Sequence, residues 1–338
     1  MKKVVFLITN LNIGGAERVL ADTVNKLPFD VTVLTLYGKG DFEKEFKVKR
    51  KTIFKRNIKS PLIQKIIGLL LKTKVYKNYL YKKYIKDKYD VEVAFLEGPM
   101  TEILSVSSNP NKYAFVHTDL DKHFKKENKD KVYDVYSKFK AIVFSSKSSM
   151  KSFNKYIENK FNKKLIHNYI DDSRIKNLSK KKIDYDNFFL YVGRFRKEKG
   201  VLRLIEIFKK RKESLIMIGD GPLYNEALGM VKDYPNIILL GALNNPYPYI
   251  KRARALIMPS YYEGYPTVAR EAAILNTFVI STNTGAKEAL ENYPNKVISD
   301  DIEKNIDKFI KGEFKIKPYT FKEESLEKII NLIEGIND

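Results

Sequence analysis

Short apolar runs alternate with longer amphipathic stretches along almost the whole chain, and this alternation constrains the fold more than any other feature. The runs have the length of single β-strands, from Val4–Thr9 near the start to Phe278–Ser281 near the end. Strands that alternate with helices form parallel sheets, because the crossover helices cover both faces of the sheet. The sequence therefore predicts an α/β protein built from doubly wound, Rossmann-like domains.

A polar, lysine-rich stretch at 171–187 divides this pattern into two halves. Since 338 residues suit two domains, we interpret the stretch as a linker and expect domains over 1–170 and 171–318, with a cleft between them. The expected strands are Val4–Thr9, Val31–Leu36, Val91–Leu96, Tyr113–Val116, Ala141–Ser145, Phe188–Val192, Ser214–Ile218, Ile237–Leu240, Ala255–Met258 and Phe278–Ser281. The expected helices include Ala16–Lys26, Ile63–Lys86 with Gly68 as its weak point, and Phe321–Ile336.

The composition narrows the functional class. The chain has no Cys and three His, which excludes disulfides and argues against a multi-histidine metal centre. Its net charge of +22 favours polyanionic partners such as nucleic acid, an anionic membrane or phosphorylated substrates. No apolar run is long enough to span a bilayer, and the first one is too short for a signal peptide. These features predict a cytoplasmic protein.

The stretch Ser260–Ala273 is the most informative motif. Glu263 and Glu271 flank a Gly-Tyr-Pro turn and the opening of an apolar helix. Because Ala255–Met258 is a predicted strand, Glu263 is expected in a loop at a strand's carboxyl end. Pro266 suits the first helical turn, and the helix directs its N–H groups and positive dipole end at this loop. The motif predicts an anion cradle with a carboxylate on each side, which suits a nucleotide-sugar.

Two other turns between a strand and a helix carry glycine. Gly14 and Gly15 follow the first strand and permit close approach of a phosphate or sugar. Their spacing is not G-x-G-x-x-G, and no acidic residue ends the second strand, which argues against NAD. Gly193 ends a later strand and is followed by Arg194 and Lys199. By themselves, Arg194 and Lys199 would be interpreted as exposed, solvated charges. Because they follow the end of a strand, we favour the interpretation that they stabilise a diphosphate leaving group.

His117 and two Asp-x-Asp triplets are the remaining candidates. His117 follows a predicted strand in the first half and is expected to face the cleft. A triplet of this kind holds Mn²⁺ or Mg²⁺ in another class of sugar transferases. The triplet of Asp184 and Asp186 precedes a strand, at the wrong end of the sheet, whereas Asp119 and Asp121 are better placed. Because two basic residues already supply positive charge, we expect no essential metal.

The two halves of the predicted helix Ile63–Lys86 differ in character. The first half carries aliphatic residues at helical spacing, which is typical of a helix that packs on its sheet. The second half interleaves Tyr76, Tyr79, Tyr81 and Tyr84 with lysines. Aromatic rings at headgroup depth and lysines near anionic lipid are typical of a membrane surface. We therefore expect peripheral attachment to the inner face of the cell membrane.

Together the motifs resemble those of family 4 glycosyltransferases, which have the GT-B fold. The resemblance covers nearly the whole chain and rests on Gly14–Arg18, Gly193–Gly200, Gly219–Pro222 and Glu263–Glu271. It implies two Rossmann-like domains that face a central cleft, and a last helix, over 319–338, that returns to the first domain. It also implies retaining transfer from a nucleotide-sugar without an essential metal or other cofactor.

The resemblance further implies roles for individual residues. Arg194 and Lys199 would hold the donor diphosphate, while Glu263 and His117 would contact the donor sugar. These four are the expected catalytic residues. The expected donor-binding residues are Gly14, Gly15, Gly193, Ala242, Leu243, Gly264, Tyr265, Thr267, Val268 and Glu271.

The expected activity is retaining transfer of a hexose or N-acetylhexosamine from a nucleotide-sugar, with UDP as the expected nucleotide. The expected acceptor is a lipid-linked saccharide or polysaccharide in bacterial surface glycan synthesis. Two alternatives stay open: a nucleotide-sugar epimerase on the same fold, and a basic nucleic-acid-binding protein that lacks any recognised nucleic-acid motif. Arg270 departs from the family's pattern, since an apolar or small residue is more usual before Glu271.

Overall fold

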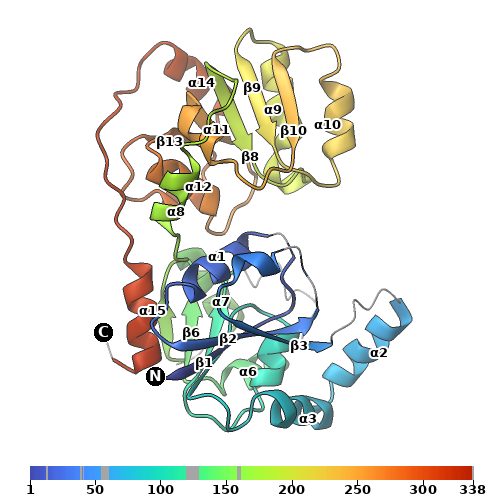
Figure 1. Ribbon diagram of the computed structural model, residues 1–338. Helices are drawn as coiled ribbons and strands as arrows, with labels where there is room; N and C mark the ends of the chain where they lie inside the picture. Colours follow the sequence, from blue (N-terminus) through green and yellow to red (C-terminus); the bar gives the residue numbers. More distant parts are fainter. Residues whose placement is uncertain are drawn as a thin grey trace. The chain divides into compact units, whose positions relative to one another are not determined.

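The computed structural model describes residues 1–12, 14–38, 40, 42–54, 61–118, 129–157 and 161–336. Contacts divide the chain into two compact units (Figure 1). Unit 1 comprises Met1–Ile170 with Glu324–Asp338, and unit 2 comprises Asp171–Glu323. Each unit is a parallel sheet with covering helices, which confirms the expected pair of Rossmann-like α/β domains. None of the described helices combines the length and the apolar character that crossing a membrane requires.

Within the described residues, unit 1 holds a seven-stranded parallel sheet in the order β3-β2-β1-β4-β5-β6-β7. Its strands are β1 (Lys3–Ile8), β2 (Asp30–Tyr37), β3 (Lys49–Phe54), β4 (Val91–Ala94), β5 (Lys112–Val116), β6 (Ala141–Phe144) and β7 (Lys163–Leu165). Its helices are α1 (Gly15–Val24), α2 (Pro61–Leu71), α3 (Lys74–Tyr84), α4 (Pro99–Leu104), α6 (Lys129–Tyr136), α7 (Lys147–Tyr156) and α15 (Ser325–Glu334). The winding reverses between β1 and β4.

Both faces of this sheet are buried, as the near-continuous apolar runs predicted. Alternate residues of a strand point to opposite faces, so Val5 and Leu7 belong to one core and Val4 and Phe6 to the other. Helices α2, α3, α4, α6 and α7 contribute to the first core. Helix α1 and the C-terminal helix α15, red in Figure 1, contribute to the second.

Within the described residues, unit 2 holds a six-stranded parallel sheet in the order β10-β9-β8-β11-β12-β13. Its strands are β8 (Phe188–Val192), β9 (Ser214–Ile218), β10 (Ile237–Gly241), β11 (Ala255–Met258), β12 (Phe278–Ser281) and β13 (Lys296–Ile298). Its helices are α8 (Asp172–Leu178), α9 (Val201–Lys209), α10 (Tyr224–Met230), α11 (Tyr247–Arg252), α12 (Thr267–Ile274), α13 (Ala286–Ala289) and α14 (Ile302–Ile310). The winding reverses between β8 and β11, and ligands of doubly wound sheets bind at such a reversal.

The helix predicted over Ile63–Lys86 is two helices in the structure. Helix α2 ends at Leu71 and α3 begins at Lys74, so the break lies at Thr73 rather than at Gly68. The hydroxyl of Thr73 accepts a hydrogen bond from the Tyr76 N–H at 3.3 Å. This side-chain cap stabilises a new helix start, whereas glycine within a helix costs only about 1 kcal/mol.

The stretch predicted as a linker is helical in its first half. Asp171 caps α8 by accepting a hydrogen bond from the Arg174 N–H at 3.0 Å. Helix α8 then packs against α11 and α12 of unit 2. The first half of this stretch is polar because α8 is a short helix at the surface of unit 2, and not because it is an unstructured linker.

Candidate functional site

An ion pair lies at the point in unit 2 where the winding reverses. Lys199 ends a short 3₁₀ turn after β8, and Glu263 lies in the loop after the neighbouring strand β11. The Lys199 Nζ lies 2.7 Å from Glu263 Oε1 and 2.6 Å from Oε2. Their side chains are 26% and 10% exposed, and Ser260 donates a second hydrogen bond to Oε1 at 2.7 Å. The structure thus brings together two predicted catalytic residues that are far apart in sequence.

Close backbone contacts fix the two loops that carry this ion pair. Gly200 has a φ of +66°, and a Cβ there would lie 2.2 Å from the Pro259 carbonyl oxygen. Next to it, the Tyr261 N–H donates to the Glu198 carbonyl at 2.8 Å. Only glycine therefore allows the loop after β8 to lie directly against the end of β11.

Neighbouring loops at this edge are held together in the same way. A Cβ on Gly219 would lie 1.9 Å from the Gly193 carbonyl oxygen, and one on Gly285 would lie 1.8 Å from that of Gly264. The Gly285 N–H also donates to the Glu263 carbonyl at 3.1 Å. The predicted donor-binding residues Gly193 and Gly264 therefore pack against glycines of adjacent loops. At the carboxyl edge of this sheet, the backbones of neighbouring loops are therefore in direct van der Waals contact.

The N-terminus of α12 opens beside Glu263. Pro266 is the N-cap residue rather than part of the first turn, and no side chain caps the helix. The N–H groups of Thr267 and Val268 have no acceptor within the helix, and the positive end of the helix dipole lies there. Glu271 follows one turn later and is half-buried. An uncapped helix end of this kind can bind an anion such as a phosphate.

Arg270 is tied to the segment that precedes α15. Its guanidinium lies 2.8 Å from a Glu323 oxygen, with the two side chains 7% and 10% exposed. The same guanidinium lies 5.7 Å from the ring centre of Tyr265 and 5.1 Å from that of Phe321. Burial raises the pKa of Tyr265 to about 12, although Arg270 acts in the opposite direction. The unusual arginine thus connects the predicted donor loop to the chain segment that leaves unit 2.

Three other predicted residues lie at the same edge of unit 2. Arg194 has an exposed side chain, and its carbonyl accepts a hydrogen bond from the Tyr191 hydroxyl at 2.9 Å. Ala242 and Leu243 follow β10, which lies two strands from β8. Arg194 and Lys199 therefore follow the same strand, β8. Ala242 and Leu243 follow β10, the strand at one end of the described sheet.

In unit 1, the segment after β1 is packed at Leu11, whose carbonyl accepts a hydrogen bond from the Phe42 N–H at 3.1 Å, and α1 begins at Gly15. Gly14 is the N-cap residue of α1, in an extended conformation without a side-chain cap. A Cβ on Gly15 would meet no atom within 4 Å, so internal packing does not require glycine there. The N–H groups of this helix start have no acceptor within the helix, and the role of Gly14 and Gly15 in donor binding stays a prediction.

His117 follows β5 and is held by Glu97, which follows β4. One oxygen of Glu97 accepts hydrogen bonds from the His117 N–H at 2.7 Å and the Thr118 N–H at 2.8 Å. The imidazole packs on Phe95, with ring centres 4.8 Å apart, and its buried Nε2 has no hydrogen-bond partner among the described residues. Burial lowers the pKa of His117, while Glu97 opposes that shift. The ring is therefore neutral at neutral pH.

Glu97 was not among the predicted residues. Its place just beyond a strand at the winding reversal is the signal that could have identified it. The triplet of Asp119 and Asp121, the better placed of the two candidate metal triplets although no essential metal was expected, lies outside the described residues. In the part of the chain that the structure describes, no three His, Cys, Asp or Glu side chains cluster as metal ligands would.

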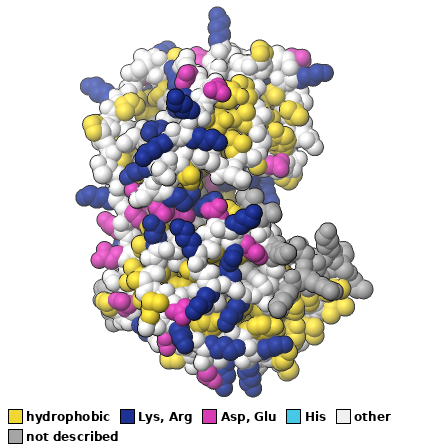
Figure 2. Space-filling view, viewed as in Figure 1, with side chains coloured by type: hydrophobic (Ala, Val, Ile, Leu, Met, Phe, Trp, Pro, Cys, Tyr) yellow, Lys and Arg dark blue, Asp and Glu magenta, His cyan; other side chains and the backbone are white. Residues whose placement is uncertain are grey.

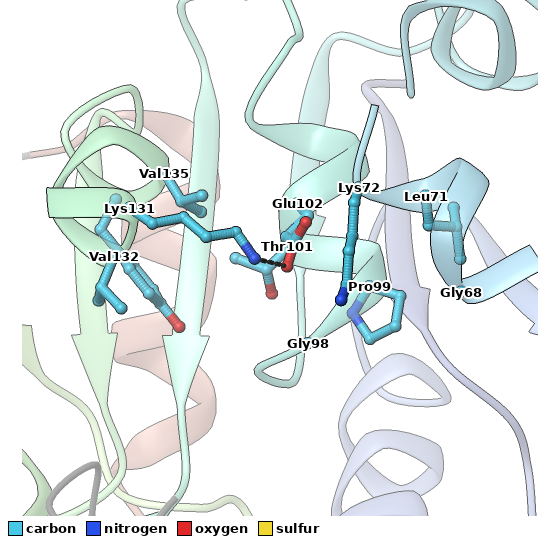
Figure 3. Close-up of a pocket in the computed structure, with 11 residues that line it drawn as sticks. Gly68, Leu71, Lys72, Gly98, Pro99, Thr101, Glu102, Lys131, Val132 and Val135 are labelled. Atoms are coloured by element: carbon cyan, nitrogen blue, oxygen red, sulfur yellow. Dashed lines mark hydrogen bonds and ion pairs between the residues drawn. The ribbon is translucent and has the colours of Figure 1, made fainter. Parts of the chain in front are cut away.

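A cavity of about 270 Å³ lies between α2, α4 and α6 of unit 1 (Figure 3). Leu71, Val132 and Val135 contribute apolar side chains to it. At its margin, Glu102 lies 3.1 Å from the Lys131 Nζ and 3.3 Å from that of Lys77. This cavity was not predictable from the sequence, because its lining comes mainly from three separate helices.

Comparisons with known proteins identify relatives along the chain. Residues 172–326 match the family model described as glycosyl transferases group 1. The chain is 30% identical over 321 residues to the capsular polysaccharide biosynthesis glycosyltransferase CapH of Staphylococcus aureus, covering 87% of this chain and 84% of CapH. It is 27% identical over 315 residues to N-acetylgalactosamine-N,N'-diacetylbacillosaminyl-diphospho-undecaprenol 4-alpha-N-acetylgalactosaminyltransferase of Campylobacter jejuni, covering 85% and 83% of the two chains.

A solved structure shares the fold of the whole chain. The crystal structure of Anabaena HepE in complex with UDP and glucose matches with a TM-score of 0.70, covering 99% of this chain and 94% of HepE. At 16% sequence identity, this likeness establishes the fold alone.

Proposed function

This chain belongs to the glycosyl transferases of group 1, and from that membership we propose that it is a retaining, metal-independent hexosyl- or N-acetylhexosaminyltransferase. The proposed donor is a nucleotide-sugar, with UDP as the nucleotide. The proposed acceptor is a lipid-linked saccharide or polysaccharide of a bacterial surface glycan. The observation that carries the proposal is the Lys199–Glu263 pair, held at the winding reversal beside the uncapped end of α12.

The donor diphosphate would be held by two kinds of positive group. Lys199 and Arg194 supply side-chain charge, and the N–H groups of Thr267 and Val268 supply a fixed helix end. Because Lys199 already contacts Glu263, the ammonium is positioned before any ligand arrives. Preorganised charge of this kind stabilises the negative charge that develops on a leaving diphosphate.

Glu263 would orient the sugar rather than attack it. Its carboxylate has an ion-pair partner and a hydroxyl donor, which lowers its nucleophilicity, so we propose a same-face displacement. The bond from the anomeric carbon to the phosphate oxygen breaks, and the acceptor oxygen bonds to that carbon on the same face. The acceptor proton passes to the leaving diphosphate. His117, neutral because it is buried, would accept or donate a hydrogen bond at the sugar without adding charge.

The names of the relatives support the acceptor class. CapH acts in capsular polysaccharide biosynthesis, and the Campylobacter enzyme is named for an undecaprenol-linked substrate. HepE was crystallised with UDP and glucose, which supports UDP as the nucleotide. An acceptor of this kind is embedded in a membrane, so we also propose that the chain works peripherally at the inner face of the cell membrane.

A thermal-shift panel tests the proposed donor directly. The protein is heated with UDP-, GDP- and ADP-linked hexoses and N-acetylhexosamines, with and without EDTA. A true donor raises the melting temperature by mass action, and EDTA leaves the shift unchanged. No shift with any nucleotide-sugar, or a shift that EDTA removes, contradicts the donor site or its metal independence. Proton NMR of the product then establishes whether the anomeric configuration is retained.

A further inference from the structure

Helix α2 exposes part of the aliphatic stretch that was expected to pack on the sheet. Ile67 and Leu71 point into the core of unit 1, at 6% exposure each. On the rest of the helix, Ile63, Ile66, Leu69 and Leu70 are 48%, 47%, 56% and 40% exposed. We call these last four residues the α2 face. The prediction that this aliphatic stretch packs on the sheet is therefore correct for one side of the helix and wrong for the other.

Large exposed apolar side chains gather on this part of the described surface. Val75 and Tyr79 of α3 extend the α2 face, at 81% and 52% exposure. Figure 2 shows hydrophobic side chains at the lower right, where Figure 1 places α2 and α3. A contiguous apolar patch on a folded protein marks an interaction surface, whereas single exposed apolar residues need no explanation.

The charge around the patch identifies its partner. No Asp or Glu occurs between Phe46 and Lys86, while Lys and Arg recur throughout that stretch. Lys65 and Lys72 of the α2 region and Lys74 and Lys82 of α3 are exposed. An apolar face bordered by lysines and free of carboxylates complements an anionic lipid surface, where each lysine contributes roughly 1 kcal/mol.

We propose that the α2 face inserts into the headgroup region of an anionic phospholipid bilayer and docks unit 1 on the membrane. This assigns the membrane contact to α2, with α3 as its flank, instead of to the tyrosines of α3 alone. Tyr76 and Tyr84 are half-buried and Tyr81 is buried, so they are not available for insertion. Docking itself is independent of the proposed function, but its use in catalysis depends on the lipid-linked acceptor proposed above.

The cavity behind α2 gives this docking a consequence for the acceptor. Gly68 and Leu71 of α2 line that cavity from one side, and Lys72 and Lys131 lie at it (Figure 3). Gly98 lines it from the loop that also carries Glu97, the residue that holds His117. A bilayer against the α2 face would therefore present lipid-anchored groups beside a cavity that carries Lys72 and the paired Lys131 and Glu102, next to the predicted catalytic edge of unit 1.

Vesicle sedimentation tests the proposal on the full chain. Wild-type protein is mixed with vesicles of phosphatidylcholine alone or with added phosphatidylglycerol. The test variant is Ile66→Ser/Leu69→Ser, and the matched control is Leu228→Ser, which removes an equally exposed leucine from α10 of unit 2. Melting curves verify that all three proteins are folded.

We expect wild type and control to bind vesicles with phosphatidylglycerol and to bind neutral vesicles more weakly. The double variant should lose about tenfold or more in vesicle affinity, because it removes two inserting side chains. Equal binding by the double variant and wild type overturns the proposal, as does the absence of wild-type binding. A wild-type dimer in sedimentation velocity that the double variant abolishes, without vesicle binding, would instead make the α2 face an interface between copies.

The same samples separate this proposal from the proposed function. Each protein is also tested for the nucleotide-sugar thermal shift without vesicles. A chain that binds donor but no vesicles contradicts docking alone. A chain that docks through the α2 face but binds no nucleotide-sugar contradicts the donor site alone.

Discussion

The carboxyl edges of the two sheets share close glycine packing but differ in the charged groups that they carry. In unit 2, glycines that tolerate no side chain hold the loops together, and a nearly buried carboxylate pairs with Lys199. In unit 1, Gly40 packs in the same way against the backbone of Leu11, but Gly15 has open space around it, and the buried imidazole of His117 is neutral. The flank of unit 1 is apolar and basic. The same doubly wound sheet thus carries a fixed ion pair at its carboxyl edge in one unit and an exposed apolar, basic flank in the other.

Breaking the Arg270–Glu323 pair should produce the largest effect on stability. Arg270→Met leaves the Glu323 carboxylate buried without its charged partner, which costs about 3–5 kcal/mol of unfolding free energy. Urea denaturation measures this loss. The double variant Arg270→Met/Glu323→Leu should recover most of it. If both variants are as stable as wild type, the pair does not stabilise unit 2.

Removing the charge of Lys199 should produce the largest effect on activity. Lys199→Ala should lower kcat/KM by about a hundredfold or more, because a preorganised cation at the leaving group is lost. The matched control is Lys209→Ala, which removes a lysine paired with Glu206 on the surface of α9. Steady-state kinetics with the identified donor compare the two. Similar values for both variants would contradict the assigned role of Lys199.

A pair of glycine substitutions sharpens the contrast between the two edges. Gly285→Ala places a methyl group 1.8 Å from the Gly264 carbonyl oxygen and should cost about 1–3 kcal/mol of stability. Gly15→Ala meets no atom within 4 Å, so the melting temperature should not fall, while donor or acceptor binding weakens. Calorimetry and kinetics provide the two measurements. Equal destabilisation by both substitutions would show that the edges do not differ.

The neutral state of His117 predicts a modest dependence of stability on pH. The unfolded chain takes up a proton near the ordinary His pKa of 6.5, and the folded chain does so only at lower pH. Unfolding is therefore accompanied by proton uptake just below pH 6.5. As the pH is lowered through this range, the free energy of unfolding decreases by up to about 1.4 kcal/mol per pH unit. His117→Asn should reduce this slope in urea denaturation between pH 7 and 5. An unchanged slope would show that His117 is readily protonated in the fold.

The sequence identified the central strands of both sheets but not three of the outer ones. Strands β3 and β7 end the sheet of unit 1, and β13 ends that of unit 2. Each has a neighbour on one side only, and β3 begins with three basic residues. An edge strand need not be apolar on both faces, so it lacks the continuous apolar run that marks a central parallel strand.

The residues of the candidate site were predicted one by one, but the contacts between them were not. Strand ends followed by Gly, Lys or Glu identified Lys199 and Glu263 separately. Their ion pair depends on β8 and β11 becoming neighbours, which the chain order does not specify. Arg270 was an anomaly in the sequence because its partner, Glu323, is 53 residues away. The exposure of the α2 face was not predicted, because helical periodicity does not specify which of the apolar residues of a helix contact the sheet.

A crystal structure with the identified nucleotide-sugar, grown without divalent metal, tests the central claim most directly. We expect the diphosphate within hydrogen-bond distance of the Thr267 and Val268 N–H groups and of Lys199, with Glu263 on the sugar hydroxyls. A diphosphate bound elsewhere, or a donor that binds only through a cation at Asp119 and Asp121, would contradict the account.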